Sequence, residues 1–281
     1  MRLWYQSPAE DWNSALPLGN GKLGAMVFGG PVAERIQLNE DSVWSGGFRD
    51  RVNPDCKNNL PEIRRLLREG DIAQAENLAT LAMAGTPEFE RMYQTLGDIY
   101  LTMENQAGEV EHYTRQLDLD NALCTVSYTS GGVDYTREAY ISAPHNVMVV
   151  RLDSSRKGGV SFQVRMHRGR YTDGTFQDKE QNAIYYTGGE GIRFCSMLRA
   201  SAVGGTVEVA GEYLVVKNAD QATLTWTAAT TYRVEDPVEE CRRVLDAASL
   251  PERELWQAHL QDYQALYNRA RLTLAADSAL E

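Results

Sequence analysis

The segment VSFQVRMH, residues 160–167, alternates apolar and polar side chains without interruption. In an extended strand, its apolar residues would point to one face of a sheet and its polar residues to the other. The segment ATLTWTA, residues 222–228, repeats this pattern. The apolar positions of the two segments are Val160, Phe162, Val164, Met166, Ala222, Leu224, Trp226 and Ala228. A two-residue period persists over most of residues 90–235, which predicts a mainly β protein.

Glycine-rich breaks separate the expected strands at hairpin-like intervals. They fall at residues 130–132, 154–159, 188–191 and 204–205. Closely spaced antiparallel strands with one apolar face each are typical of two packed sheets. The pattern therefore predicts a large antiparallel β-sandwich.

Helices are expected in two places only. One place is a helical insertion at about residues 59–85, where a helix beginning at Asn59 or Leu60 would end at Gly70. A second helix, capped by Asp71, would end at Gly85. The other place begins near Pro251 and carries one aromatic face. That face consists of Trp256, Leu260, Tyr263 and Tyr267.

These elements predict a sandwich domain over residues 1–250 and a linker helix over residues 251–281. The aromatic face of the linker helix has two possible partners. It could pack back on the sandwich, as amphipathic helices usually do, or part of it could contact another domain.

Composition limits the ligands that the protein is expected to bind and the cellular compartment in which it is expected. The formal net charge of −11 argues against nucleic acid, whose affinity depends on protein cations, and suits a neutral ligand such as a sugar. No run of about 18 apolar residues could span a membrane. The first residues lack the apolar core of a signal peptide, so the sequence as written predicts a cytoplasmic protein, with secretion of a longer precursor left open.

Cysteine and histidine spacings give no sign of a metal or redox centre. The cysteines Cys56, Cys124, Cys195 and Cys241 form no C-x-x-C pair, and we expect buried free thiols. The four histidines are far apart and show no H-x-x-x-H spacing. We therefore expect no metal site.

The tract ALPLGNGKLGAMVFGG, residues 15–30, contains G-x-G-x-x-G at Gly19, Gly21 and Gly24. A dinucleotide site needs a buried strand before these glycines and a helix directly after them. Pro17 argues against the strand, and the glycines at 29–30 argue against the helix. We expect a short strand at residues 25–28 and glycine turns in place of a nucleotide site.

The tract LPLGNGKLGAMVFGG, residues 16–30, followed by LNEDSVWSGG, residues 38–47, resembles the N-terminal domain of glycoside hydrolase family 95, the α-L-fucosidases. Further tracts that resemble this domain, in the same order, are LPEIRRLLREG at 60–70, YQTLGDIYL at 93–101, YTREAYISAPHNVMVVRL at 135–152, ATLTWTAATTYRVEDP at 222–237 and HLQDYQALYNRARLTL at 259–274. The sequence departs from the pattern at Thr95, where a proline is expected, and at His145 and Asn146.

The resemblance implies that this domain is part of a larger enzyme. Such an enzyme would hydrolyse terminal α-linked fucose from oligosaccharides with inversion and without a metal or organic cofactor. Its catalytic residues would lie on a helical (α/α) barrel that this chain lacks. The barrel and a fucosylated oligosaccharide are then the expected partners. This domain would provide structural support and part of the substrate cleft.

The second tract, residues 38–47, holds the candidate site residues Asn39, Glu40, Asp41 and Trp44. Glu40 and Asp41 are neighbours that would point to opposite faces of a strand unless the backbone turns sharply, so we do not expect them to be a catalytic pair. We expect no catalytic residue in this chain. Asn39 and Asp41 could fix the loop through side-chain to backbone hydrogen bonds.

The same loop could instead contact a sugar or another domain. Trp44 offers an aromatic face, while Asn20, Asn39 and Glu40 offer hydrogen bonds to hydroxyls. Two rival functions stay open. The chain could be a freestanding carbohydrate-binding module, or a complete small hydrolase with carboxylates that the sequence does not pair.

Overall fold

The computed structural model describes residues 1–104, 108–169 and 172–272. The chain divides into two compact units. The sandwich unit combines Met1–Val43 with Thr95–Glu281, and the helical unit is Trp44–Gln94. Among the described residues, no helix is both long and apolar enough to cross a membrane.

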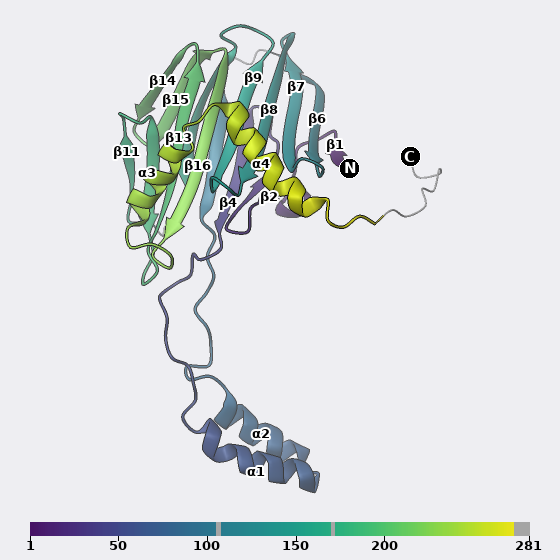
Figure 1. The fold of residues 1–281 in the computed structure, drawn as a ribbon, viewed down its shortest axis with the longest axis vertical. Helices are drawn as coiled ribbons and strands as arrows, with labels where there is room; N and C mark the ends of the chain where they lie inside the picture. Colours follow the sequence, from purple (N-terminus) through teal and green to yellow (C-terminus); the bar gives the residue numbers. More distant parts are fainter. Residues whose placement is uncertain (105–107, 170–171, 273–281) are drawn as a thin grey trace. The chain divides into compact units, whose positions relative to one another are not determined.

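The sandwich unit contains two antiparallel sheets (Figure 1). The nine-stranded sheet has, in spatial order, β1 (Arg2–Tyr5), β6 (Val110–Asp118), β7 (Leu123–Ser130), β8 (Val133–Ser142), β9 (Val147–Ser154), β16 (Gln221–Thr230), β13 (Phe194–Val203), β12 (Ala183–Gly188) and β11 (Gly174–Asp178). The seven-stranded sheet has β14 (Thr206–Ala210), β15 (Tyr213–Ala219), β10 (Val160–His167), β5 (Gly97–Met103), β4 (Ala33–Glu40), β3 (Leu23–Val27) and β2 (Leu16–Gly19). A short 3-10 helix, η1 (Trp12–Ser14), precedes β2. The predicted antiparallel sandwich is confirmed.

The main core fills the space between the two sheets. The apolar positions of β10 and β16 that the alternation predicted are all buried there. Trp226 is fully buried, and its indole Nε1 donates a hydrogen bond to Ser196 Oγ at 2.8 Å. This bond satisfies the one polar group of the indole, as a buried tryptophan requires.

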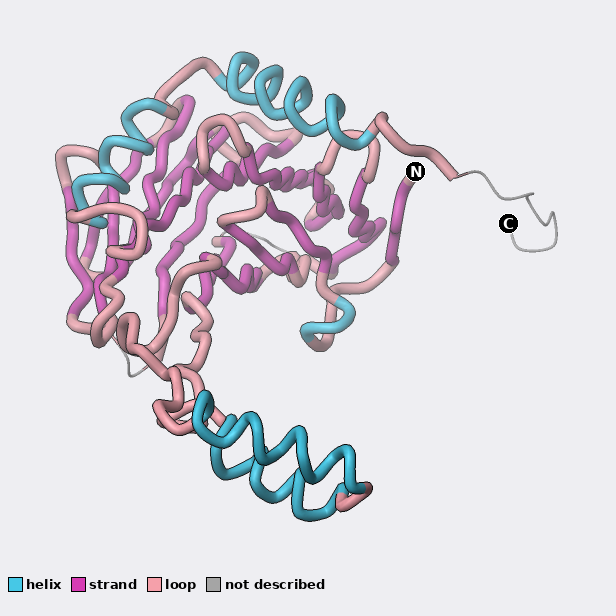
Figure 2. Tube along the Cα trace, turned by 60° about the horizontal axis from the view of Figure 1, so that its bottom comes forward, coloured by secondary structure: helices cyan, strands magenta, loops and turns pink. Residues whose placement is uncertain are grey.

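Two helices cover the outer face of the nine-stranded sheet, α3 (Pro237–Ala247) and α4 (Glu252–Tyr267) (Figures 1 and 2). The expectation of helices in only two places is wrong, because α3 was missed. Its start carries ordinary signals: Asp236 accepts hydrogen bonds from the backbone of Val238 and Glu239, and Pro237 occupies the first turn. A second apolar cluster lies under these helices, so part of the sheet is buried on both faces.

The aromatic face of α4 packs on the sandwich, the first of its two predicted alternatives. The rings of Trp256 and His259 lie 5.1 and 4.8 Å from the ring of Tyr140 in β8. Tyr263 donates a hydrogen bond from its hydroxyl to the carbonyl of Leu119 at 2.6 Å. Residues 273–281 of the predicted linker lie outside the described residues, and the domain boundary at residue 250 stays a prediction.

The helical unit contains α1 (Cys56–Glu69) and α2 (Ile72–Met83). Helix α1 begins before the predicted Asn59, and Pro61 lies inside the helix, not in its first turn. Gly70 ends α1 in a left-handed conformation, and Asp71 caps α2, both as predicted. Helix α2 ends at Met83, two residues before the predicted Gly85.

The four cysteines are free, but only three of them are buried. Cys124 and Cys195 lie in strands β7 and β13, and Cys241 lies in α3. The prediction of a buried thiol is wrong for Cys56, which is half-buried at the start of α1. A unit of two helices offers less covering surface than a sandwich interior.

A buried ion pair joins the two sheets. Glu34 in β4 and Arg137 in β8 form an ion pair, with side chains 0 % and 4 % exposed respectively. The other carboxylate oxygen of Glu34 accepts hydrogen bonds from the backbone N–H groups of Gly29 and Arg35, at 2.8 and 3.0 Å. Arg137 Nη1 donates to the carbonyl of Gly30 at 3.1 Å. Both charges are therefore compensated inside the protein.

The ion pair encloses a turn that requires glycine. Gly29 has a φ of +80°, and a Cβ on Gly30 would lie 1.9 Å from the carbonyl oxygen of Ala33. Tyr113 donates from its hydroxyl to the carbonyl of Gly29 at 2.6 Å. The conformation of Gly29 and the lack of a side chain at Gly30 thus allow the polar contacts of this turn.

We predict that Glu34→Gln strongly lowers the free energy of unfolding, by about 3–5 kcal/mol, because it leaves Arg137 buried without a counter-charge. Chemical denaturation checks this value. The matched control is Glu62→Gln, which removes one carboxylate of an exposed ion pair with Arg65 on α1. Equal effects of the two substitutions would contradict the prediction, since exposed pairs contribute little.

Candidate functional site

The five predicted site residues are divided between the two units. Asn20, Asn39, Glu40 and Asp41 belong to the sandwich unit, and Trp44 is the first residue of the helical unit. Glu40 is the last residue of β4 and pairs with Leu23 in β3, while Asn39 pairs with Gly24. The site in the sandwich unit is therefore built at the end of the β3–β4 pair.

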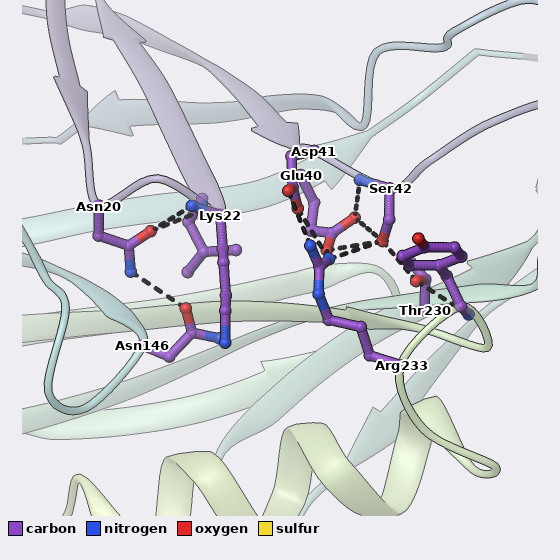
Figure 3. Close-up of polar contacts among 10 residues, drawn as sticks. Asn20, Lys22, Glu40, Asp41, Ser42, Asn146, Thr230 and Arg233 are labelled. Carbon is purple, nitrogen blue, oxygen red and sulfur yellow. Dashed lines mark hydrogen bonds and ion pairs between the residues drawn. The ribbon is translucent and has the colours of Figure 1, made fainter.

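Glu40 fixes the turn that follows β4 (Figure 3). Its side chain is 4 % exposed, and its carboxylate accepts hydrogen bonds from the backbone N–H of Ser42 at 2.8 Å and from the Ser42 hydroxyl at 2.8 and 2.9 Å. The backbone N–H of Val43 donates to the carbonyl of Glu40 at 3.3 Å. Glu40, to which the sequence assigned no such role, therefore helps to fix this loop.

Arg233, which follows β16, holds both acidic neighbours. Its Nη1 donates to Glu40 Oε1 and to Asp41 Oδ1, each at 2.8 Å, and its Nη2 donates to Asp41 Oδ2 at 2.8 Å (Figure 3). The chain turns at Asp41, which is the exception left open for these neighbours, so one guanidinium binds both carboxylates. Sequence reasoning missed Arg233, since 192 positions separate it from Asp41.

Hydroxyl groups complete the cluster. The Ser42 Oγ lies 2.6 Å from Thr230 Oγ1, and Arg233 Nη1 donates to Ser42 Oγ at 3.0 Å. Thr230 is the last residue of β16 in the nine-stranded sheet. We call Glu40, Asp41, Ser42, Thr230 and Arg233 the Arg233 cluster. It connects the end of a strand in one sheet to the end of a strand in the other.

Asn20 has a similar connecting role in a neighbouring turn. Its Oδ1 accepts from the backbone N–H groups of Lys22 and Leu23 at 3.0 and 2.7 Å. Its Nδ2 donates to Asn146 Oδ1 at 3.0 Å (Figure 3). It also donates to the carbonyl of Ser142 at 3.3 Å. Asn146 has a φ of +51°, a conformation that asparagine tolerates better than most residues. Asn146, where the sequence departs from the family pattern, therefore suits the backbone conformation of its turn.

Burial and hydrogen bonding shift the pKa values of two members of the Arg233 cluster. Burial raises the pKa of Glu40, and the hydrogen bonds that Arg233 donates to Asp41 raise the pKa of Arg233. An inverting pair of carboxyl groups needs a separation of about 6.5–9.5 Å to admit water. The bound oxygens of Glu40 and Asp41 are closer together, because each lies 2.8 Å from the same Nη1 atom. The cluster neutralises its carboxylates and fixes a turn.

Trp44 packs within the helical unit. It forms a β-bridge with Tyr93, and the two rings meet edge to face with centroids 5.4 Å apart. The backbone N–H of Ser45 donates to the carbonyl of Met92 at 2.8 Å. Trp44 is 37 % exposed, so part of its ring is open to solvent. Among the described residues, no group of three or more His, Cys, Asp or Glu side chains could hold a metal ion.

Comparison with known proteins identifies a family and relatives. The family model described as "Glycosyl hydrolase family 65, N-terminal domain" matches residues 3–235. "Alpha-L-fucosidase 2" of Arabidopsis thaliana is 32 % identical over 100 % of this chain and 37 % of its own length. "Probable alpha-fucosidase A" of Aspergillus oryzae is 27 % identical over 97 % of this chain and 41 % of its own length.

The chain therefore spans about two fifths of the length of these curated relatives. The predicted resemblance to α-L-fucosidases is confirmed, although the family model carries the number 65. A solved structure, "Putative kojibiose phosphorylase from human microbiome", aligns with a TM-score of 0.54 and 11 % identity over 95 % of this chain and 38 % of that one. This likeness shows the fold alone.

Arg233→Met should lower the free energy of unfolding by about 1–2 kcal/mol at neutral pH, because Glu40 stays buried without its cation. The pKa of Glu40 would rise further in the folded protein. The folded state would then retain a proton that the unfolded state releases, so stability would fall as pH rises above about 4.5. Denaturation between pH 4.5 and 7 tests this slope. The double variant Glu40→Gln/Arg233→Met should lack this added pH dependence of the free energy of unfolding. If the double variant keeps it, Glu40 is not its cause.

Trp44→Ala should destabilise the helical unit, because it removes the edge-to-face contact with Tyr93. We expect faster amide hydrogen exchange in residues 44–94 and no change in saccharide binding. Trp12→Ala, at an exposed tryptophan of the sandwich unit, is the control. Loss of saccharide binding with unchanged exchange would instead favour the carbohydrate-binding module.

Proposed function

Because the chain belongs to the family of glycosyl hydrolase family 65 N-terminal domains, we propose that it is the non-catalytic N-terminal domain of a larger fucosidase. The full enzyme would hydrolyse terminal α-linked fucose from oligosaccharides with inversion. A catalytic (α/α) barrel following this domain would carry the acid and the groups that activate water.

The alignment with the fucosidase of Arabidopsis thaliana carries this proposal. The match covers the whole chain but little more than a third of the relative. A domain of this kind leaves most of the relative's length for other functions, including catalysis. The tracts that resemble family 95 support fucose as the sugar, and the charge of −11 suits a neutral substrate.

The geometry of the Arg233 cluster supports the absence of catalysis in this chain. A general acid must reach the leaving oxygen, and its partner must leave room for water. Glu40 is buried and bound to Arg233, and Asp41 is bound by the same guanidinium. Both carboxylates are therefore engaged in ion pairs within the fold. Their role would be to hold the turn at residues 40–43 in place as part of the wall of a substrate cleft.

We predict that the purified 281-residue chain releases no fucose from an α-1,2-fucosylated oligosaccharide. Free fucose is measured over time, with the same assay on the Arabidopsis thaliana α-L-fucosidase 2 as a positive control. Release of fucose that is lost in Glu40→Gln or Asp41→Asn would overturn the proposal and support a complete small hydrolase.

A further inference from the structure

A cavity of about 420 Å³ lies between the outer face of the nine-stranded sheet and the first two turns of α4. Its volume is within the range of about 300–1,000 Å³ that is typical of small-molecule sites. The lining residues come from β7, β8, β9 and α4. They are Leu123, Glu138, Tyr140, Arg151, Glu252, Arg253 and Trp256. None of them belongs to the Arg233 cluster.

We propose that this cavity, which we call the α4 cavity, binds an uncharged saccharide, with Trp256 against the ring and Tyr140, Glu138 and Glu252 bonded to its hydroxyl groups. The proposal concerns a binding site and includes no turnover. It is independent of the proposed fucosidase function, except that L-fucose is chosen as a probe because of that function.

The buried hydroxyl of Tyr140 is the first feature that points to a ligand. The residue is 5 % exposed, and its hydroxyl has no hydrogen-bond partner among the described residues. Burial, followed by the carboxylates of Glu252 and Glu138, raises the pKa of Tyr140, so the phenol remains a donor. Buried hydroxyls without a partner are rare because each costs free energy. Tyr140 lines the cavity, and a ligand hydroxyl that displaces the side chains covering the phenol would supply the partner that it lacks.

The charges around the cavity select against ions. Two carboxylates, Glu138 and Glu252, are balanced by two guanidinium groups, Arg151 and Arg253. Arg151 Nη1 donates to Glu252 at 2.8 Å, and its Nε lies 2.7 Å from Asp153. A bound cation or anion would have to compete with these internal pairs. A neutral ligand with many hydroxyl groups can bond to them without disturbing the balance.

The aromatic geometry points to the same class of ligand. The rings of Trp256 and Tyr140 meet edge to face, with centroids 5.1 Å apart and an interplanar angle of 68°. Two rings in mutual contact leave no space for an ammonium group between them, which an aromatic cage would require. Trp256 remains half-buried at the cavity wall, where its ring can pack against the apolar face of a sugar.

The test is a calorimetric titration of the 281-residue chain with L-fucose and D-galactose. Titration to about 50 mM detects sites with a Kd in the millimolar range. Choline and acetate serve as the cationic and anionic probes. We expect saturable binding of at least one of the two sugars and no binding of either ion. Absence of binding for both sugars, or preferred binding of an ion, would overturn the proposal.

Two variants locate the site. Tyr140→Phe removes only the hydroxyl and should weaken sugar binding about tenfold without lowering the melting temperature, because the free hydroxyl has no partner to lose. Trp256→Phe should also weaken binding. The matched controls are Tyr232→Phe and Trp12→Phe, at exposed positions outside the cavity, which should bind as the unchanged chain does. Equal affinities for all four variants would place any sugar site elsewhere and exclude the α4 cavity.

Discussion

The inner face of strand β4 has a carboxylate at each end, and both must be neutralised inside the protein. Glu34, Ile36, Leu38 and Glu40 alternate along this buried face. Burial of an unpaired carboxylate is costly, so each requires a cation at hydrogen-bond distance. Arg137 of the opposite sheet binds Glu34, and Arg233, which follows a strand of that sheet, binds Glu40. The two apolar residues between them supply the core contact, while the two ion pairs align the sheets at both ends of the strand.

This arrangement explains the glycine tract better than a ligand does. The turn at residues 29–31 must bring its backbone against Glu34 and Arg137, and a side chain at Gly30 would collide with Ala33. The peptide groups of the turn then serve as hydrogen-bond partners for the buried charges. Gly29 and Gly30 are therefore required by this turn, whose backbone groups bond to the buried ion pair.

The sequence predicted the features that depend on neighbouring residues. Strand alternation around Phe162 and Trp226, the left-handed end of α1 at Gly70 and the cap at Asp71 each follow from local chemistry. Arg233 could not be found in this way, because nothing near it indicates a partner 193 positions away. Helix α3 differs from Arg233, because its start at Asp236 and Pro237 is a local signal from which a helix could have been predicted. Adjacent carboxylates at 40 and 41 converge because a turn, which alternation does not reveal, separates them.

Helix α4 shows how packing at one end of an element can create a site at the other. His259 donates from Nε2 to the carbonyl of Asn121 at 2.9 Å, and burial lowers the pKa of this histidine, so the neutral ring is retained in the core. With Tyr263 bonded one turn later, the second half of the helix is held against the sheet. Glu252 and Trp256 lie four residues apart in the first half, on one face of the helix. Both contact the sheet, Glu252 through Arg151 at 2.8 Å and Trp256 through the ring of Tyr140, and the cavity lies among these side chains.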